Sequence, residues 1–226
     1  AESYKSNYTK MKIGILGSGA VGKALAAGFA AEGHEVKLGT RDPNASKITE
    51  WLASAREGIS AGTFAETAKF GEMIILCPLY RAVEEVLKLA GKENLKGKIV
   101  IDTTNPIADE PPVNGVLKYT TTGKESAGEI IQNMLPDSHV VKAFNSVGSA
   151  LMHKPSFEDG QPTMFICGNN DDAKRSVSGV LTAFGWDKLD CGSIEASNAL
   201  EGLCIIWCAR GFREGQWNHA FKLLKK

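Results

Sequence analysis

Short apolar runs alternate along the chain with longer segments in which apolar residues recur at helical spacing. The runs expected to form buried strands lie near Lys12–Leu16, Val36–Gly39, Ile59–Ala61, Met73–Leu76, Lys98–Asp102, Val140–Phe144, Thr163–Cys167 and Lys188–Cys191. Helices are expected near Ala20–Glu32, Ala45–Ala55, Arg81–Ala90, Ser126–Met134, Asp171–Phe184 and Ser197–Ala209. Strands that alternate with helices need crossover connections, which favour a parallel sheet covered on both faces. The pattern therefore predicts an α/β fold with a Rossmann-like, doubly wound, mainly parallel sheet.

The two ends of the chain depart from this alternation. Residues 1–10 are polar and precede a strand that opens at Met11, so we interpret them as a tag or a disordered lead. Residues 11–192 carry the alternation and are expected to form the Rossmann domain. Residues 193–226 are helical in pattern and rich in aromatic side chains, and we expect a short helical C-terminal extension. It should pack on the sheet or on a partner subunit, which makes a homodimer the expected assembly.

Composition disfavours several classes of function. Lys and Arg together number 26, as do Asp and Glu, so the chain has no net charge that would attract nucleic acid. No apolar run approaches the roughly 20 residues needed to cross a bilayer, and the stretch before Met11 has no signal-peptide core, so we expect a cytoplasmic protein with no membrane partner. The five cysteines are scattered without a C-x-x-C pair, which argues against a disulfide framework or a structural zinc site.

A glycine-rich turn joins the first predicted strand to the first predicted helix. It consists of Gly17, Ser18, Gly19, Ala20, Val21 and Gly22. In this motif the first glycine permits a tight turn, the second lets the backbone approach a pyrophosphate, and the third lets helix and strand pack closely. The N-terminus of the helix then offers free N–H groups and the positive end of its dipole to the phosphates. Because strand, motif and helix occur in order, the turn predicts a dinucleotide site.

The same turn nearly matches the phosphate loop of nucleoside triphosphatases, since Gly17, Gly22 and Lys23 are in place. That loop needs Ser or Thr after the lysine to hold magnesium, and this chain has alanine at position 24. We therefore reject a phosphotransferase.

The end of the second strand indicates which dinucleotide binds. NAD-specific domains place an acidic residue there, where it accepts hydrogen bonds from the ribose 2′-OH. This chain has Thr40 and Arg41 instead. A guanidinium can pair with a 2′-phosphate and a hydroxyl adds a donor, while Ser46 and Lys47 begin the next helix within reach of the same group. We therefore predict NADP(H), although Arg41 could also be a solvated loop charge.

The nicotinamide half of the site is expected at the carboxyl ends of the later strands. Residues there that could line it, or merely cap their turns, are Cys77, Pro78, Leu79, Val83, Asn105, Pro106 and Asn145. The prolines make rigid turns, and the two asparagines offer amide groups to a carboxamide or a substrate. Residues 109–124 lack periodicity and are expected to form a loop beyond a strand end, where loops carry binding groups.

The sequence resembles a known family at several of these points. They are Met11 to Gly17, Gly39-Thr40-Arg41-Asp42-Pro43, Asp102-Thr103-Thr104-Asn105-Pro106, Val141-Lys142-Ala143-Phe144-Asn145, Cys167-Gly168-Asn169-Asn170-Asp171 and the closing Ala220 to Leu224. The chain is similar to the NADPH-dependent reductases of the 8-hydroxy-5-deazaflavin coenzyme F420, and to the oxidoreductase domain of the STEAP metalloreductases.

That resemblance implies roles for individual residues. Adenosine and phosphates would be held by Ser18, Ala20, Val21, Thr40 and Arg41. Pro78 and Leu79 would flank the cofactor, and Ala143 would lie near the nicotinamide. The family has a bulky or imidazole side chain in parts of the second-substrate site where this chain has Leu79 and Asn145. A flavin, a quinone or another acceptor is therefore an alternative to the deazaflavin.

The dispersed histidines favour hydride exchange between two rings. The four are scattered, and no Ser-His-Asp or Lys-Tyr arrangement lies close to the pocket motifs. Carbonyl or imine reduction needs a positioned proton donor, for which Lys142 and Asp102 are the candidates. The function expected is an NADP-dependent oxidoreductase acting on a small-molecule redox substrate. A small NADP-dependent ketone or imine reductase is the second hypothesis, and a non-catalytic NADPH-sensing module is the third.

Overall fold

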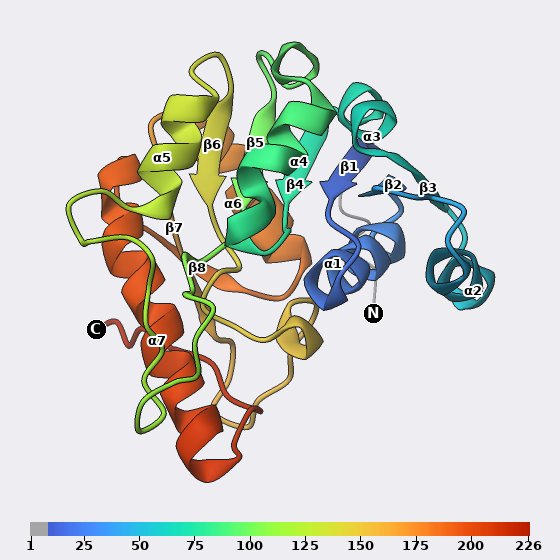
Figure 1. Cartoon of the computed structure of the whole chain (residues 1–226). Helices are drawn as coiled ribbons and strands as arrows, with labels where there is room; N and C mark the ends of the chain where they lie inside the picture. Colours follow the sequence, from blue (N-terminus) through green and yellow to red (C-terminus); the bar gives the residue numbers. More distant parts are fainter. Residues whose placement is uncertain (1–8) are drawn as a thin grey trace.

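The chain folds around an eight-stranded sheet with the strand order β3-β2-β1-β4-β5-β6-β7-β8 (Figure 1). The computed structural model describes residues 9–226, so the expected tag or disordered lead lies, over residues 1–8, outside the described residues. The strands are β1 (Lys12–Leu16), β2 (Glu35–Thr40), β3 (Ile59–Thr63), β4 (Met73–Leu76), β5 (Ile99–Asp102), β6 (His139–Lys142), β7 (Thr163–Gly168) and β8 (Asp187–Asp190). All neighbouring pairs are parallel except β6 with β7.

Helices cover both faces of the sheet, as the doubly wound fold requires. On one face, α1 (Ala20–Ala31) and α6 (Asp171–Ala183) share a buried core with Ile13 and Ile15 of β1. On the other, α3 (Phe64–Phe70), α4 (Val83–Ala90) and α5 (Ala127–Met134) share a core with Leu16. Alternate residues of β1 thus contribute side chains to two different cores, since successive side chains of a strand point to opposite faces. The predicted fold class is confirmed.

Helix α3 is the element that the hydrophobic pattern did not predict. It is only seven residues long, too short for a clear amphipathic period. Its start is nonetheless encoded locally, because the Thr63 hydroxyl accepts the N–H of Glu66 while the Glu66 carboxylate accepts the N–H of Thr63. This is a capping box of the same kind as the one at the start of α5, where Ser126 and Glu129 make the two reciprocal hydrogen bonds.

Strand β6 ends earlier than its apolar run predicted. The run continues to Phe144, but the strand stops at Lys142 and Phe144 has a positive φ of 62°. Its ring is buried against Phe184, with 5.8 Å between the ring centroids. A left-handed backbone is strained for an aromatic residue, so core packing of the ring overrides local preference at this strand end.

The C-terminal part of the chain contains one long helix, α7 (Ser197–Glu214), which packs against α5 and β7. Figure 1 shows it along one side of the molecule, with the loop that follows β5 running beside it. That loop is tied down where the Tyr119 hydroxyl donates to the carbonyl oxygen of Glu201, at 2.6 Å. The predicted helical C-terminal extension is present as α7, and residues 215–226, which follow it, form no helix. They return along the sheet, where the N–H of Thr163 donates to the carbonyl oxygen of Phe221.

Within residues 9–226, the helices are all too short or too polar to cross a bilayer.

Candidate functional site

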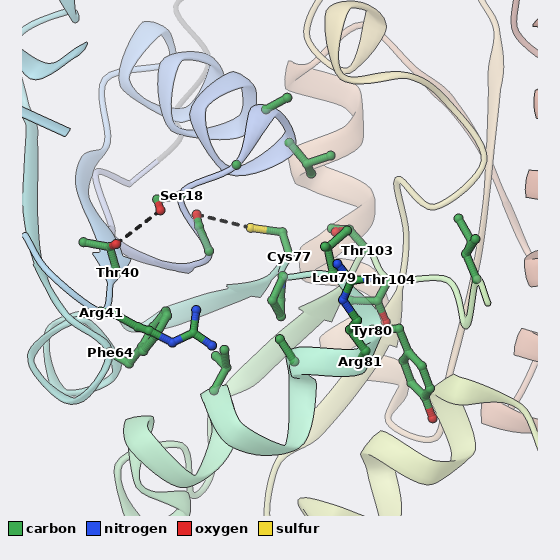
Figure 2. A pocket seen from close by; sticks show the side chains of 18 of the residues that line it. Ser18, Thr40, Arg41, Phe64, Cys77, Leu79, Tyr80, Arg81, Thr103 and Thr104 are labelled. Atoms are coloured by element: carbon green, nitrogen blue, oxygen red, sulfur yellow. Dashed lines mark hydrogen bonds between the residues drawn. The ribbon is translucent and has the colours of Figure 1, made fainter. Parts of the chain in front are cut away.

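A cleft of about 840 Å³ lies at the carboxyl ends of β1, β2, β4 and β5. This is where the strand order reverses between β1 and β4, the position at which doubly wound sheets bind ligands. Figure 2 shows Ser18, Thr40 and Arg41 on one side of the cleft and Leu79, Tyr80, Thr103 and Thr104 on the other. The predicted residues that line it are Gly17, Ser18, Gly19, Ala20, Val21, Thr40, Arg41, Lys47, Cys77, Pro78, Leu79 and Asn105.

The three motif glycines meet different surroundings. Gly17 has a φ of +142° and would bring a Cβ within 2.9 Å of the Cys77 backbone. A Cβ on Gly22 would lie 2.0 Å from the carbonyl oxygen of Gly17, so helix and turn can pack here only without a side chain. A Cβ on Gly19 would meet no protein atom within 4 Å, although Gly19 lines the cleft. The space above Gly19 is therefore open to a ligand.

Cys77 packs directly against the glycine turn. Its thiol points at the carbonyl oxygens of Leu16 and Gly17, with its Sγ 3.6 and 3.7 Å away, as one of the dashed lines of Figure 2 marks. Burial raises the pKa of this thiol to about 12, because a thiolate would be desolvated there. Cys77 therefore supports the turn and is not a nucleophile at neutral pH.

The end of β2 forms the second wall of the cleft. The Ser18 hydroxyl donates to Thr40 Oγ1 at 3.3 Å, which ties the glycine turn to this strand end (Figure 2). Arg41 extends from the same strand end and pairs with Glu85 of α4, where its Nη2 lies 2.7 Å from Oε2. The pair raises the pKa of Arg41 and lowers that of Glu85. Arg41 is thus a stable cation at the cleft, held by a carboxylate.

Six predicted residues do not line the cleft. They are Gly22, Ser46, Val83, Pro106, Ala143 and Asn145. Gly22 lies behind the turn, Val83 faces the core under α4, and Ser46 is exposed at the start of α2 (Ser46–Ser54).

The last three of these residues lie beneath the surface at the ends of β5 and β6. Pro106 is buried, and the side chain of Ala143 is fully buried in the core shared with α1, because β6 ends just before it. Asn145 is 4% exposed and acts through a neighbour, since its amide donates to Asn105 Oδ1 at 3.1 Å. Asn105 is therefore the asparagine that borders the cleft.

Several lining residues were not among the predicted cofactor-binding residues. They are Asp42, Ala45, Phe64, Tyr80, Arg81, Ala82, Val86, Thr103, Thr104, Ile107, Ala108 and Asp109. Thr103 and Thr104 follow β5 directly and belong to the segment Asp102–Pro106 that the sequence singled out. Arg81 forms an ion pair with Asp109 at 2.8 Å, which joins the segment after β4 to the loop after β5. That pair depends on tertiary placement and leaves no local pattern.

A buried charge cluster lies beneath this end of the cleft. Lys142 Nζ is 2.8 Å from Asp102 Oδ2 and 2.9 Å from Glu201 Oε1, and it donates to the carbonyl oxygen of Thr104 at 2.7 Å. Burial by itself would lower the pKa of Lys142, but the two carboxylates outweigh it and the pKa is raised. Glu201 also accepts the N–H groups of Ala127 and Gly128 at the start of α5. The cluster fixes the cleft-lining segment that begins at Thr103.

Comparison with known proteins assigns the family. The family model described as NADP oxidoreductase, coenzyme F420-dependent, matches residues 12–106. The F420-dependent NADP reductase of Methanocaldococcus jannaschii is 32% identical over 208 residues, which cover 85% of this chain and 89% of that protein. The chain belongs to this family. The predicted class of enzyme, an NADP-dependent oxidoreductase, is confirmed at the level of the family.

Two further relatives and one protein that shares only the fold extend the comparison. Metalloreductase STEAP3 of Rattus norvegicus is 31% identical over 194 residues, which cover 85% of this chain but only 36% of that protein. A solved structure from Arthrobacter sp. FB24, described as a candidate F420-dependent NADP reductase, has a TM-score of 0.88 at 31% identity and covers 95% of this chain and 100% of that one. An imine reductase from Aspergillus terreus shares the fold alone, with a TM-score of 0.64 at 18% identity over 92% of this chain and 64% of that one.

Proposed function

We propose that this chain binds NADPH along the cleft and transfers hydride between it and a deazaflavin or flavin-like ring. The observation that carries the proposal is the combination, in one cleft, of an unobstructed glycine turn and a strand end at which Thr40 and Arg41 stand where NAD-specific domains have a carboxylate. Bound NADPH supplies a hydride to the acceptor, and the residues of the chain hold the two rings face to face. An F420-type deazaflavin is the acceptor that family membership favours.

The residues at the adenosine end fit the cofactor. The space above Gly19 admits a close approach of pyrophosphate to the backbone. Helix α1 begins there without a side-chain cap, so its first N–H groups are available to an anion. Arg41 and Lys47 supply positive charge where a 2′-phosphate would lie, and the Thr40 hydroxyl adds a polar group.

The residues at the other end favour a ring acceptor over a carbonyl. Lys142 and Asp102, the candidate proton donors, are fully buried and committed to one another beneath the cleft. Leu79 and Ile107, by contrast, line the cleft with 66% and 41% of their surface exposed. A planar ring would cover such apolar side chains. For carbonyl or imine reduction, Tyr80 is the candidate proton donor on this wall, and burial raises the pKa of its hydroxyl.

The direct test is rapid-mixing oxidation of NADPH bound to the chain, with F420, FMN, FAD and a panel of ketones and imines as acceptors. We expect a single-turnover loss of NADPH absorbance with at least one ring acceptor, unchanged by Tyr80→Phe. Oxidation by ketones or imines alone, abolished by Tyr80→Phe, would favour the carbonyl reductase. Binding of NADPH without oxidation by any acceptor would favour a sensing module.

Arg41→Asp tests the cofactor assignment. We expect the variant to bind NADPH roughly tenfold more weakly or worse, because a charge-assisted pair becomes a repulsion, while NADH affinity changes far less. Fluorescence titration with both nucleotides measures the two affinities. Arg56→Asp is the matched control, since Arg56 is exposed and precedes β3, away from the cleft. An equal loss for both nucleotides would show that Arg41 does not recognise the 2′-phosphate.

The homodimer also stays a prediction. It is supported by exposed apolar side chains on α7 and the tail that follows it, namely Ile206, Phe212, Trp217 and Leu224. Apolar groups of this size are enriched where subunits meet.

A further inference from the structure

The Arg41–Glu85 pair joins the two walls of the cleft at its adenosine end. Arg41 comes from the end of β2 and Glu85 from α4, 44 residues further along the chain. The guanidinium meets the carboxylate with two of its nitrogens, at 2.7 Å for Nη2 and 3.4 Å for Nε. One edge of the guanidinium is thereby occupied by an anion that belongs to the protein.

We propose that Glu85 is a selectivity residue that competes with the 2′-phosphate of NADP(H) for Arg41. The proposal rests on the function proposed above, in which Arg41 meets that phosphate. Carboxylate and phosphate are alternative partners of one guanidinium, because both present oxygens spaced to accept two parallel N–H groups. Glu85 therefore lowers the affinity for the phosphorylated cofactor without being touched by it.

Exposure makes this competition reversible. The side chains of Arg41 and Glu85 are 62% and 55% exposed, so water and salt screen the pair and it is weak. A dianionic phosphate with three acceptor oxygens can displace a carboxylate in such a setting. Once displaced, Glu85 remains on α4 as a negative charge close to the phosphate, which further reduces affinity. NAD(H) has no phosphate at this position, and Arg41 can stay paired with Glu85 when it binds.

The consequence is that affinity for NADP(H) exceeds affinity for NAD(H) by a smaller factor than Arg41 alone would give. Removing the Glu85 charge should tighten every ligand that has a 2′-phosphate and leave every ligand that lacks one unchanged. A purely structural ion pair between β2 and α4 would do the opposite, because its loss would loosen Arg41 and weaken binding of the phosphate.

The experiment is calorimetric titration of the full chain with adenosine 2′,5′-bisphosphate and with 5′-AMP, which lacks the 2′-phosphate. For Glu85→Gln we expect roughly two- to fivefold tighter binding of the bisphosphate and no change for 5′-AMP. Glu84→Gln is the matched control, because Glu84 is the exposed neighbour on the same helix and forms no ion pair within residues 9–226. It should bind both ligands as the parent does.

A double-mutant cycle tests whether Glu85 acts through Arg41. In an Arg41→Gln background, Glu85→Gln should tighten the bisphosphate by less than in the native background, because only the direct repulsion between Glu85 and the phosphate remains. An equal gain in both backgrounds would overturn the competition for Arg41. Unchanged or weaker binding of the bisphosphate by Glu85→Gln in the native background would overturn the competition while leaving the NADP assignment intact. If Arg41→Gln itself bound the bisphosphate as tightly as the parent, the role of Arg41 in the proposed function would fail, and the role of Glu85 with it.

Discussion

Lys142→Met is expected to lower the free energy of unfolding by about 3–5 kcal/mol, because it leaves two buried carboxylates without their cation. Asp102 and Glu201 both lie within 2.9 Å of Lys142 Nζ, and neither their side chains nor that of Lys142 is more than 2% exposed. Methionine fills a similar volume, so the loss reports charge and hydrogen bonding more than packing. Urea denaturation, monitored by circular dichroism, measures the loss in free energy of unfolding.

Lys142→Met should change the pH dependence of the free energy of unfolding as well as its value. In the parent, the raised pKa of Lys142 gives stability that is fully present below the unfolded value, about 10.4, and is lost only as pH rises through the folded one. Its contribution is therefore constant at neutral pH. In Lys142→Met that loss at high pH disappears, so the difference in stability between parent and variant should narrow as pH rises through the folded pKa of Lys142.

Lys96→Met is the matched control for this prediction. Lys96 forms an exposed pair with Asp137 at 3.5 Å, and such pairs contribute little to stability. The control should unfold close to the parent and with the same pH profile. If Lys142→Met behaved like Lys96→Met, the cluster would not hold the cleft-lining segment as we infer.

Local patterns were sufficient to predict most of the sheet and the glycine turn. The segment from β1 through α1 to β2 is contiguous, and its motif, helix start and strand end follow from short-range sequence. Helix α3 was missed although Thr63 and Glu66 form a capping box, because a seven-residue helix gives too few apolar positions for periodicity to detect. A search for capping boxes independent of periodicity would have found it.

The parts of the site that escaped prediction depend on contacts between distant segments. The partners of Lys142 come from β5 and α7, and only the folded sheet brings them together. Arg41 was predicted as a cleft cation, but its partner Glu85 could not be inferred, since α4 reaches it through tertiary packing. Ala143 does not line the cleft but is buried in the core with the Phe144 ring, and its expected position near the nicotinamide stays a prediction.

Substitutions of two motif glycines, Gly22 and Gly19, are expected to affect stability and NADPH binding to different extents. Gly22→Ala should lower the free energy of unfolding by about 1–3 kcal/mol or more, because its Cβ would lie 2.0 Å from the carbonyl oxygen of Gly17 and the turn must open. NADPH binding should be lost with it. Gly19→Ala should unfold close to the parent, since a Cβ at Gly19 meets no protein atom within 4 Å.

Gly19→Ala should nevertheless weaken NADPH binding by roughly ten- to a hundredfold, because the added methyl group occupies space that the pyrophosphate needs beside the backbone. Urea unfolding and fluorescence titration of the two variants give the comparison. Gly202→Ala is the matched control, because Gly202 lies in α7 and a Cβ there would meet no atom within 4 Å. Gly33→Ala is unsuitable, because Gly33 has a φ of +88° and any side chain there is strained. If Gly19→Ala bound NADPH as tightly as Gly202→Ala, the turn would be a structural feature and the pyrophosphate would have to lie elsewhere in the cleft.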